Sequence, residues 1–193
     1  MIVQRYISNP LLIDELKFDL RIYVLVTCVQ PLRVYLYKDG LARFSTHKFE
    51  TPNESNIGNL FQHLTNYAIN KNHENFTVDE ENFATGHKRL LSTLFTEEIL
   101  NAMLEKIGDL ILKSIIAVLP GLQNAYNLSK KENPNTCFQL LGFDILMTDN
   151  MKFKLIEINQ NPSLMTETGV DKEIKNNMMR NILEMMEVPL SQS

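Results

Sequence analysis

Residues 141–163 read LGFDILMTDNMKFKLIEINQNPS, and this stretch decides how the chain folds around its acidic residues. Two apolar runs, Cys137–Met147 and Phe153–Ile158, flank the turn-like break Thr148–Met151. Apolar runs of this length around a short polar break are typical of a β-hairpin. We therefore expect two antiparallel strands here.

The register of this hairpin determines which side chains share a face. Directly opposite residues have a constant sum of residue numbers, which is 299 for a two-residue turn at 149–150 and 301 for one at 150–151. Because both sums are odd, Asp144 and Glu157 lie on the same face, and Asn159 shares it. The apolar residues of the two strands are expected to point into a core: Phe143, Ile145, Ile156 and Ile158.

Asp144, Glu157 and Asn159 are candidate ligands for a metal ion. Two carboxylates and an amide oxygen that converge from paired strands suit a hard cation such as Mg²⁺, bound together with substrate phosphates. The alternative is an amphipathic hairpin with a solvated acidic face, which is the more frequent case for an isolated Asp and Glu. The remaining motifs have to decide between the two.

Length and composition are those of an ordinary globular protein. The 193 residues are 44% apolar and 22% charged, enough for one sizeable core or for the larger part of a two-lobed domain. The longest apolar run, Leu110–Leu119, is interrupted by Lys113 and ends at Pro120, so no membrane span is predicted. The amino terminus lacks the features of a secretory signal. Cys28 and Cys137 have no metal-ligand spacing and indicate a reduced, cytosolic compartment.

The net charge of −4 argues against a nucleic-acid-binding or membrane-surface protein. The charge is distributed unevenly along the chain. Residues 1–50 carry seven Lys or Arg and five Asp or Glu, a local charge of +2, so the remainder carries −6. Composition alone indicates no reaction.

The first 50 residues are expected to be rich in strands. Four strands are predicted: Ile2–Ile7, Phe18–Cys28, Leu32–Tyr37 and Leu41–Ser45. Lys38, Asp39 and Gly40 are expected to form a hairpin turn, because Asp-Gly tolerates the positive φ that such turns need.

Helices and loops are expected in the rest of the chain. Two helices are predicted: Thr96–Leu119, with Thr96 as N-cap, and Asp171–Met186, closed by Pro189. One side of the first helix is expected to be apolar through Ile99, Met103, Ile107, Leu110 and Ile111. Loops are expected at residues 51–60, 70–88 and 130–136.

A second polar motif is the run Lys17-Phe18-Asp19-Leu20-Arg21. On a strand, Lys17, Asp19 and Arg21 share one face. They could form a half-exposed ladder of ion pairs. They could also form a wall of a nucleotide cleft, where Asp19 accepts ribose hydroxyls and the planar guanidinium of Arg21 contacts phosphate oxygens.

Two further segments carry polar groups of interest. Arg43 follows the Asp-Gly pair and, taken alone, is most simply a surface arginine. In the run HLTNY, Thr65 and Asn66 offer a hydroxyl and an amide suited to ribose and phosphate oxygens, and Lys71 follows closely. The sequence contains no Gly-rich phosphate loop and no Ser-His-Asp or Cys-His arrangement that we can place, so it does not favour covalent catalysis.

The order of these motifs is more specific than any one of them. QRYI, KxDxR, DGLARF, HLTNY, GFD and ExNxxP in this order resemble the tubulin–tyrosine ligase-like family of ATP-grasp amino-acid ligases, which act on tubulin and related proteins. The resemblance extends from about Val3 to Met186. It implies an α/β (α+β) fold, the carboxy-terminal portion of an ATP-grasp domain with an antiparallel sheet and flanking helices. We expect this domain at 1–188 without its amino-terminal lobe, and a tail at 189–193.

The resemblance also implies roles for individual residues. The nucleotide contacts would be Gln4, Arg5, Tyr6 and Ile7 at the adenine, Lys17, Asp19 at the ribose, and Thr65 and Asn66. The metal ligands would be Asp144, Glu157 and Asn159, for Mg²⁺ or alternatively Mn²⁺. Arg21 would contact phosphate and Arg43 would hold the incoming amino acid, both stabilising charge during catalysis. Tyr67 and Lys71 resemble other parts of the amino-acid pocket.

The activity implied is ATP- and Mg²⁺-dependent addition of glutamate to glutamate side chains of tubulin through an acyl phosphate. A glycylase of the same family and a non-catalytic nucleotide- or tubulin-binding fragment are the alternatives. Gln160-Asn161 stands where many glutamylases carry a basic residue followed by serine. The partners expected are the acidic tails of tubulin in microtubules and free glutamate, with no nucleic acid and no membrane. We expect a monomer in the cytoplasm on the cytoskeleton, with the cilium or basal body as a further location.

Overall fold

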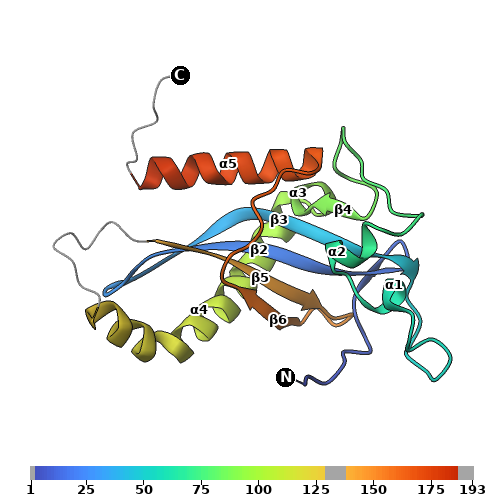
Figure 1. The fold of residues 1–193 in the computed structure, drawn as a ribbon, viewed down its shortest axis with the longest axis horizontal. Coiled ribbons are helices and arrows are strands. Elements are labelled where there is room, and N and C mark those ends of the chain that lie inside the picture. The colour runs from blue at the N-terminus through green and yellow to red at the C-terminus, as the bar shows by residue number, and fades with distance from the viewer. Residues whose placement is uncertain (1–2, 129–137, 187–193) are drawn as a thin grey trace.

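The protein is built on one antiparallel sheet with a helix on each face (Figure 1). The computed structural model describes residues 3–128 and 138–186. The strands are β1 (Leu12–Ile13), β2 (Leu16–Val29), β3 (Leu32–Lys48), β4 (Lys88–Leu90), β5 (Gln139–Met147) and β6 (Phe153–Asn159). The helices are α1 (Leu60–His63), α2 (Tyr67–Asn70), α3 (Leu91–Leu94), α4 (Glu97–Leu128) and α5 (Gly169–Met185). The strand order is β4-β3-β2-β5-β6, and β1 pairs with β2. This mixed α/β architecture confirms the predicted fold class.

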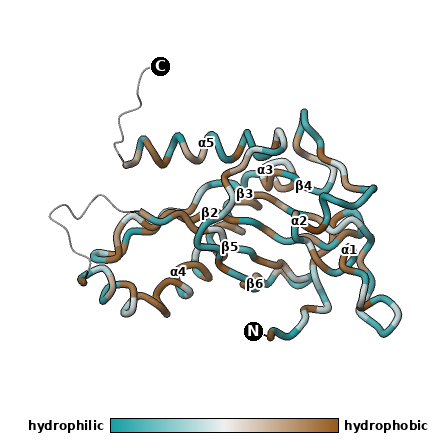
Figure 2. Tube along the Cα trace, viewed as in Figure 1, coloured by the Kyte–Doolittle hydropathy of each residue, from teal (hydrophilic) through white to brown (hydrophobic). Residues whose placement is uncertain are grey.

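Side chains of the central strand β2 alternate between two cores. Leu20 and Ile22 belong to the core that includes α4, whereas Tyr23 and Leu25 belong to the core that includes α5. This alternation follows from the period of two in a strand. Figure 2 shows hydrophobic residues along α4 and a largely hydrophilic loop after α2. No helix within residues 3–128 and 138–186 is long and apolar enough to span a membrane.

The predicted hairpin is present, but its turn differs from the expectation. The turn has three residues, closed by a hydrogen bond of 3.0 Å from the backbone N of Thr148 to the O of Lys152, and Met151 has a φ of 58°. The numbers of paired residues therefore sum to 300 near the turn. A β-bulge then leaves Ile156 without a partner and restores the odd sum of 301, at which Asp144 faces Glu157.

Two of the four apolar residues expected in the core are placed elsewhere. Phe143 and Ile145 are fully buried as predicted. Because the three-residue turn pairs Ile145 with Leu155, Leu155 packs against the core in place of Ile156. Ile158 is 40% exposed, since β6 is the outer strand of the sheet.

Two predictions for the first 50 residues are wrong. Residues 3–7 form no strand. Asp39 and Gly40 do not form a hairpin turn but lie inside the continuous strand β3, where the pairing with β2 shifts between Ile22 and Val24. A Cβ on Gly40 would lie 2.8 Å from the backbone O of Arg21, so this glycine permits close approach of the strands. The turn that joins β2 and β3 is formed by residues 30–31, between Val29 and Leu32.

The two long helices lie at the predicted positions, but the residues at which they begin and end differ from the prediction. The longer helix α4 continues to Leu128, past Pro120. The hydroxyl of Thr96 accepts a hydrogen bond of 3.5 Å from the N of Ile99, which confirms the predicted N-cap. Met103, Ile107 and Ile111 are buried as predicted, whereas Ile99 is 46% exposed. The predicted loop at 130–136 and the tail at 189–193 lie outside the described residues.

Candidate active site

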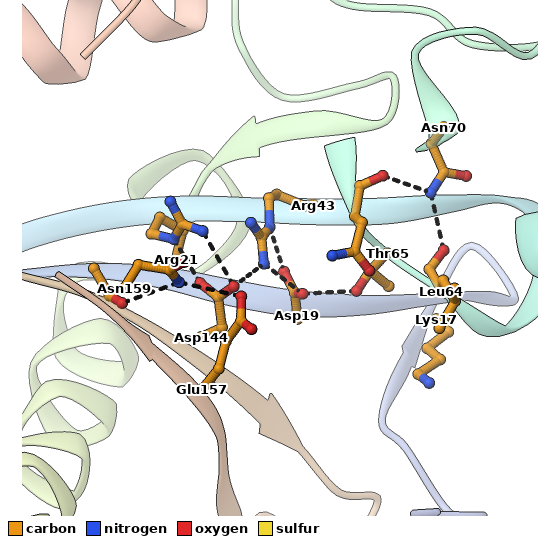
Figure 3. Close-up of polar contacts among 12 residues, drawn as sticks. Lys17, Asp19, Arg21, Arg43, Leu64, Thr65, Asn70, Asp144, Glu157 and Asn159 are labelled. Atoms are coloured by element: carbon orange, nitrogen blue, oxygen red, sulfur yellow. Dashed lines mark hydrogen bonds and ion pairs between the residues drawn. The ribbon is translucent and has the colours of Figure 1, made fainter. Parts of the chain in front are cut away.

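A chain of buried ion pairs crosses the middle of the sheet (Figure 3). The register places Asp19 opposite Arg43 and Arg21 opposite Asp144. Arg43 donates to both oxygens of Asp19 at 2.7 Å, and its Nη2 lies 2.8 Å from Oδ2 of Asp144. Arg21 donates to the same carboxylate, from Nε to Oδ1 at 2.5 Å and from Nη2 to Oδ2 at 3.1 Å. Two arginines from adjacent strands thus share Asp144.

Burial and ion pairing act in opposite directions on the charged groups of this network. Burial by itself would raise the pKa of Asp144, but the hydrogen bond from Arg21 and the charge of Arg43 hold that pKa below its ordinary value. Burial would lower the pKa of Arg43, and the carboxylates of Asp19 and Asp144 raise it instead. Asp144 and Arg43 therefore remain ionised at neutral pH.

Glu157 and Asn159 extend this polar face toward solvent. The amide of Asn159 donates to Oε1 of Glu157 at 3.2 Å and to the backbone O of Gly142 at 3.4 Å. Glu157 is exposed and lies opposite Asp144 in the register. No group of three or more His, Cys, Asp or Glu side chains is placed to bind a metal in the described part of the chain. A cation here would draw on two carboxylates and one amide oxygen, with its other ligands coming from phosphate or water, which is how Mg²⁺ is commonly held.

Thr65 is tied to the same network from the loop between α1 and α2. Its hydroxyl donates to Oδ2 of Asp19 at 2.6 Å. The buried Asn70 holds this loop in place, because its amide donates to the O of Leu64 at 2.9 Å. Asn66, the second predicted residue of this motif, is exposed and lines the cleft described below.

Lys17 lies at the far end of the polar face of β2 and contacts the amino-terminal segment. Its Nζ donates to the O of His63 at 2.7 Å and to the hydroxyl of Tyr6 at 3.3 Å. Burial lowers the pKa of Lys17 to about 8, although the charge of Asp19 opposes this shift. The side chain of Gln4 donates to the O of Ile156 at 3.2 Å, so the segment passes beside β6.

The remaining predicted residues of the amino-terminal segment differ in exposure. Arg5 is exposed and Ile7 is half-buried. The hydrogen bonds of this segment described above are made by Tyr6, which accepts from Lys17, and by Gln4, which donates to β6.

A cleft of about 380 Å³ brings several of the predicted residues together. The predicted residues that line it are Arg21, Arg43, Asn66, Tyr67, Lys71, Glu157 and Asn159. Four charged residues that were not predicted from the sequence also line it: Lys88, Glu167, Asp171 and Lys175. The other predicted residues do not line this cleft: Gln4, Arg5, Tyr6, Ile7, Lys17, Asp19, Thr65 and Asp144.

Three of these unpredicted residues, Lys88, Asp171 and Lys175, form a second buried ion cluster at the start of α5. The side chain of Asp171 lies 2.5 Å from Nζ of Lys88 and 2.6 Å from Nζ of Lys175. The hydroxyl of Thr168, the N-cap of α5, donates to Asp171 at 2.9 Å. Burial lowers the pKa of Lys88, and the pairing with Asp171 only partly offsets it. The four-residue spacing of Asp171 and Lys175 is a helical signal that could have identified this pair, whereas nothing local marks Lys88.

Tyr67 and Lys71 line the cleft and both contact Glu167. The hydroxyl of Tyr67 donates to Oε2 of Glu167 at 2.8 Å, and Nζ of Lys71 lies 3.3 Å from the same oxygen. Nζ of Lys88 lies 4.2 Å from the centre of the Tyr67 ring. One side of the cleft therefore carries three lysines and two carboxylates, because Lys175 and Asp171 adjoin this group.

Comparison with known proteins identifies the family. The sequence profile described as "Tubulin-tyrosine ligase family" matches residues 1–193. The chain belongs to the tubulin-tyrosine ligase family. Its sheet and flanking helices agree with this membership.

Several relatives within the tubulin-tyrosine ligase family are similar over nearly the whole chain. A "Probable beta-tubulin polyglutamylase" of Tetrahymena thermophila is 41% identical over 194 residues, which cover 96% of this chain. "Tubulin polyglutamylase TTLL7" of Xenopus tropicalis is 40% identical over 99% of the chain, and "Tubulin polyglutamylase TTLL13" of Homo sapiens is 44% identical over 93%. The matched region is 16%, 22% and 23% of these three relatives, respectively.

Proposed function

We propose that this chain carries the metal- and amino-acid-binding part of an ATP-dependent ligase that adds glutamate to glutamate side chains of tubulin. The observation that carries the proposal is the cleft in which Glu157 and Asn159 lie beside the arginine pair on Asp144 and face a lysine-rich wall. The names of the similar polyglutamylases support tubulin as the substrate. In this proposal residues 1–188 form the carboxy-terminal part of an ATP-grasp domain.

The nucleotide would lie along the polar face of β2. Gln4, Arg5, Tyr6 and Ile7 would contact the adenine from the segment beside β6. Lys17 would interact with the nucleotide, and Thr65 and Asn66 would add contacts from the loop between α1 and α2. Both oxygens of Asp19 already accept hydrogen bonds from Arg43, and one also accepts from Thr65. A ribose hydroxyl would therefore use a remaining lone pair of Asp19.

Asp144, Glu157 and Asn159 would hold Mg²⁺, or Mn²⁺ in its place. Their oxygen donors fit a hard cation, and they share one face of the β5–β6 hairpin beside the cleft. When bound, such a cation would neutralise negative charge between the β- and γ-phosphates.

The reaction would need charge stabilisation more than a nucleophilic side chain. A carboxylate oxygen of the acceptor glutamate would attack the γ-phosphorus, and the bond to ADP would break to leave an acyl phosphate. The amine of the free amino acid would then attack the acyl carbon, releasing inorganic phosphate and a proton. Arg21 and Arg43 would stabilise the oxyanions that develop in both steps.

The charges of the cleft favour glutamate over glycine as the incoming amino acid. Lys71, Lys88 and Lys175 face Glu167 and Asp171, so this wall carries a net charge of +1. Glutamate carries a side-chain carboxylate that such a wall attracts, whereas glycine carries none. Arg43, Tyr67 and Lys71 would contact the amino acid.

Incorporation of labelled amino acids into microtubules tests the proposal. Glutamate, glycine and tyrosine would be offered separately with ATP and Mg²⁺, to this chain and to the protein extended upstream through its reading frame. Glutamate incorporation by either protein supports the ligase. Glycine incorporation would instead identify a glycylase. Nucleotide binding without incorporation of any of the three would identify a non-catalytic nucleotide- or tubulin-binding module. This function would place the protein on the cytoskeleton, with the cilium or basal body as a further location.

A further inference from the structure

Arg21 and Arg43 both contact Asp144, but they are held very differently. Arg43 is fixed by two carboxylates, because it also donates twice to Asp19. Asp19 is in turn held by the hydroxyl of Thr65. Within residues 3–128 and 138–186, Arg21 forms its ion pair with Asp144 alone. Its side chain lines the cleft.

The backbone of β5 provides the space in which Arg21 reaches Asp144. A Cβ on Gly142 would lie 3.2 Å from Cδ of Arg21 and 3.4 Å from its Nε. The arginine side chain therefore lies across this glycine, two residues before Asp144 on the same strand. A side chain at position 142 would crowd this arrangement.

Both oxygens of Asp144 already contact guanidinium groups. Its Oδ1 accepts from Nε of Arg21, and its Oδ2 accepts from Nη2 of Arg21 and lies beside Nη2 of Arg43. A cation placed on these oxygens would lie close to two guanidinium groups, and in a buried site such like-charge repulsion is strong. Glu157 remains available, since its contact is with the neutral amide of Asn159.

We propose that Arg21 is a competitor of the divalent cation for Asp144, and that it releases this carboxylate to the cation when phosphate oxygens enter the cleft and pair with the arginine instead. The inference rests on the metal site and the phosphate-contacting role of Arg21 in the proposed function. It follows that bound phosphate raises the affinity for the cation, and that bound cation raises the affinity for phosphate by the same factor. The cation alone binds weakly because Arg21 has no other anion to pair with.

Binding of Mn²⁺ alone, measured by the loss of the electron paramagnetic resonance signal of free Mn²⁺, tests this role without nucleotide or turnover. Arg21→Gln keeps a hydrogen-bonding side chain but removes the positive charge that pairs with Asp144. This variant should bind Mn²⁺ more tightly than the wild type, by at least about 5-fold. A gain in affinity cannot arise from loss of folding.

Two further variants make the result specific. Lys154→Gln removes one positive charge from an exposed position of β6, the strand that carries Glu157, without touching Asp144, so it should bind Mn²⁺ much like the wild type. Asp144→Asn combined with Arg21→Gln should lose the gained affinity. A gain in Arg21→Gln alone that is lost on adding Asp144→Asn supports the proposal.

The failures of the two proposals are distinguishable. Equal Mn²⁺ binding by wild type and Arg21→Gln, with both lost on substitution of Asp144, overturns the competition but leaves the metal site intact. An equal gain in Lys154→Gln also overturns it, because the effect is then one of overall charge. Binding that does not depend on Asp144, or no binding in any variant, overturns the metal site and the competition together.

Discussion

Asp144 lies directly opposite Glu157 across the β5–β6 hairpin, and the pairing shifts by one residue immediately beyond this pair, on the side of the turn. Without that bulge, the register set by the three-residue turn would place Ile156 opposite Asp144 and turn Glu157 toward the core. The bulge therefore brings the second carboxylate to the cleft.

Replacement of Glu157 by Gln tests the role of this pair. The side chain is exposed and keeps its shape, so the free energy of unfolding should change by less than about 0.5 kcal/mol. Turnover should fall by roughly 100-fold or more, because a charge that would hold the metal is removed. Glutamate incorporation and thermal unfolding would be measured together. Glu184→Gln, at an exposed position on α5, is the control; an unchanged rate in Glu157→Gln would remove this residue from the metal site.

Arg43→Ala should destabilise the fold strongly. It leaves Asp19 and Asp144 buried with less counter-charge, and breaking a buried pair in this way costs about 3–5 kcal/mol. Urea denaturation measures this loss. Arg33→Ala, at an exposed position of β3, should cost less than about 0.5 kcal/mol. A similarly small effect at both positions would show that the Arg43 network contributes little stability.

Arg43→Lys separates the proposed role of this residue in binding the amino acid from its role in folding. The charge is retained, but one ammonium cannot reproduce the paired hydrogen bonds of a guanidinium. We expect the KM for glutamate to rise more than the dissociation constant for ATP. If ATP affinity falls equally, Arg43 contacts phosphate instead.

Two glycines offer a matched pair for the packing of the sheet. An alanine side chain at Gly40 would lie 2.9 Å from Cδ1 of Leu91 and closer still to the backbone of β2, so Gly40→Ala should cost about 1–3 kcal/mol. Gly108 lies within α4, and such a Cβ would meet no atom within 4 Å beyond the adjacent residues and the backbone of its own helix. Gly108→Ala should therefore stabilise the protein by up to about 1 kcal/mol. Chemical denaturation of both variants would show opposite signs, and equal signs would contradict the strand contact.

The lowered pKa of Asp144 predicts a loss of stability in acid. The ordinary pKa is 3.8, and the folded protein holds the carboxylate ionised to lower pH than the unfolded chain does. The stabilisation is therefore complete above about pH 5 and is lost as pH falls through the folded pKa. Between pH 5 and pH 3, the free energy of unfolding should decrease more steeply for the wild type than for Asp144→Asn. Asp109→Asn, on the exposed side of α4, is the control, and parallel curves for wild type and Asp144→Asn would refute the linkage.

The sequence by itself determined features that depend on local periodicity. The alternation of Lys17, Asp19 and Arg21 placed them on one face of a strand. The odd parity of the hairpin placed Asp144 with Glu157, although the turn and the bulge that produce this parity were not foreseen. The ordered motifs identified the family, and the comparisons confirm it. These properties follow from backbone dihedral angles that repeat every two residues in a strand.

Only the tertiary structure decided which charged groups are partners. Because β2 lies between β3 and β5, it brings Arg21 to Asp144 and Asp19 to Arg43, residues that no local pattern connects. Lys88 meets Asp171 across 83 residues of sequence. The continuity of β3 through the Asp-Gly pair was likewise decided by its pairing with β2. A buried charge requires an opposite charge, and which one it finds depends on the order of strands in the sheet.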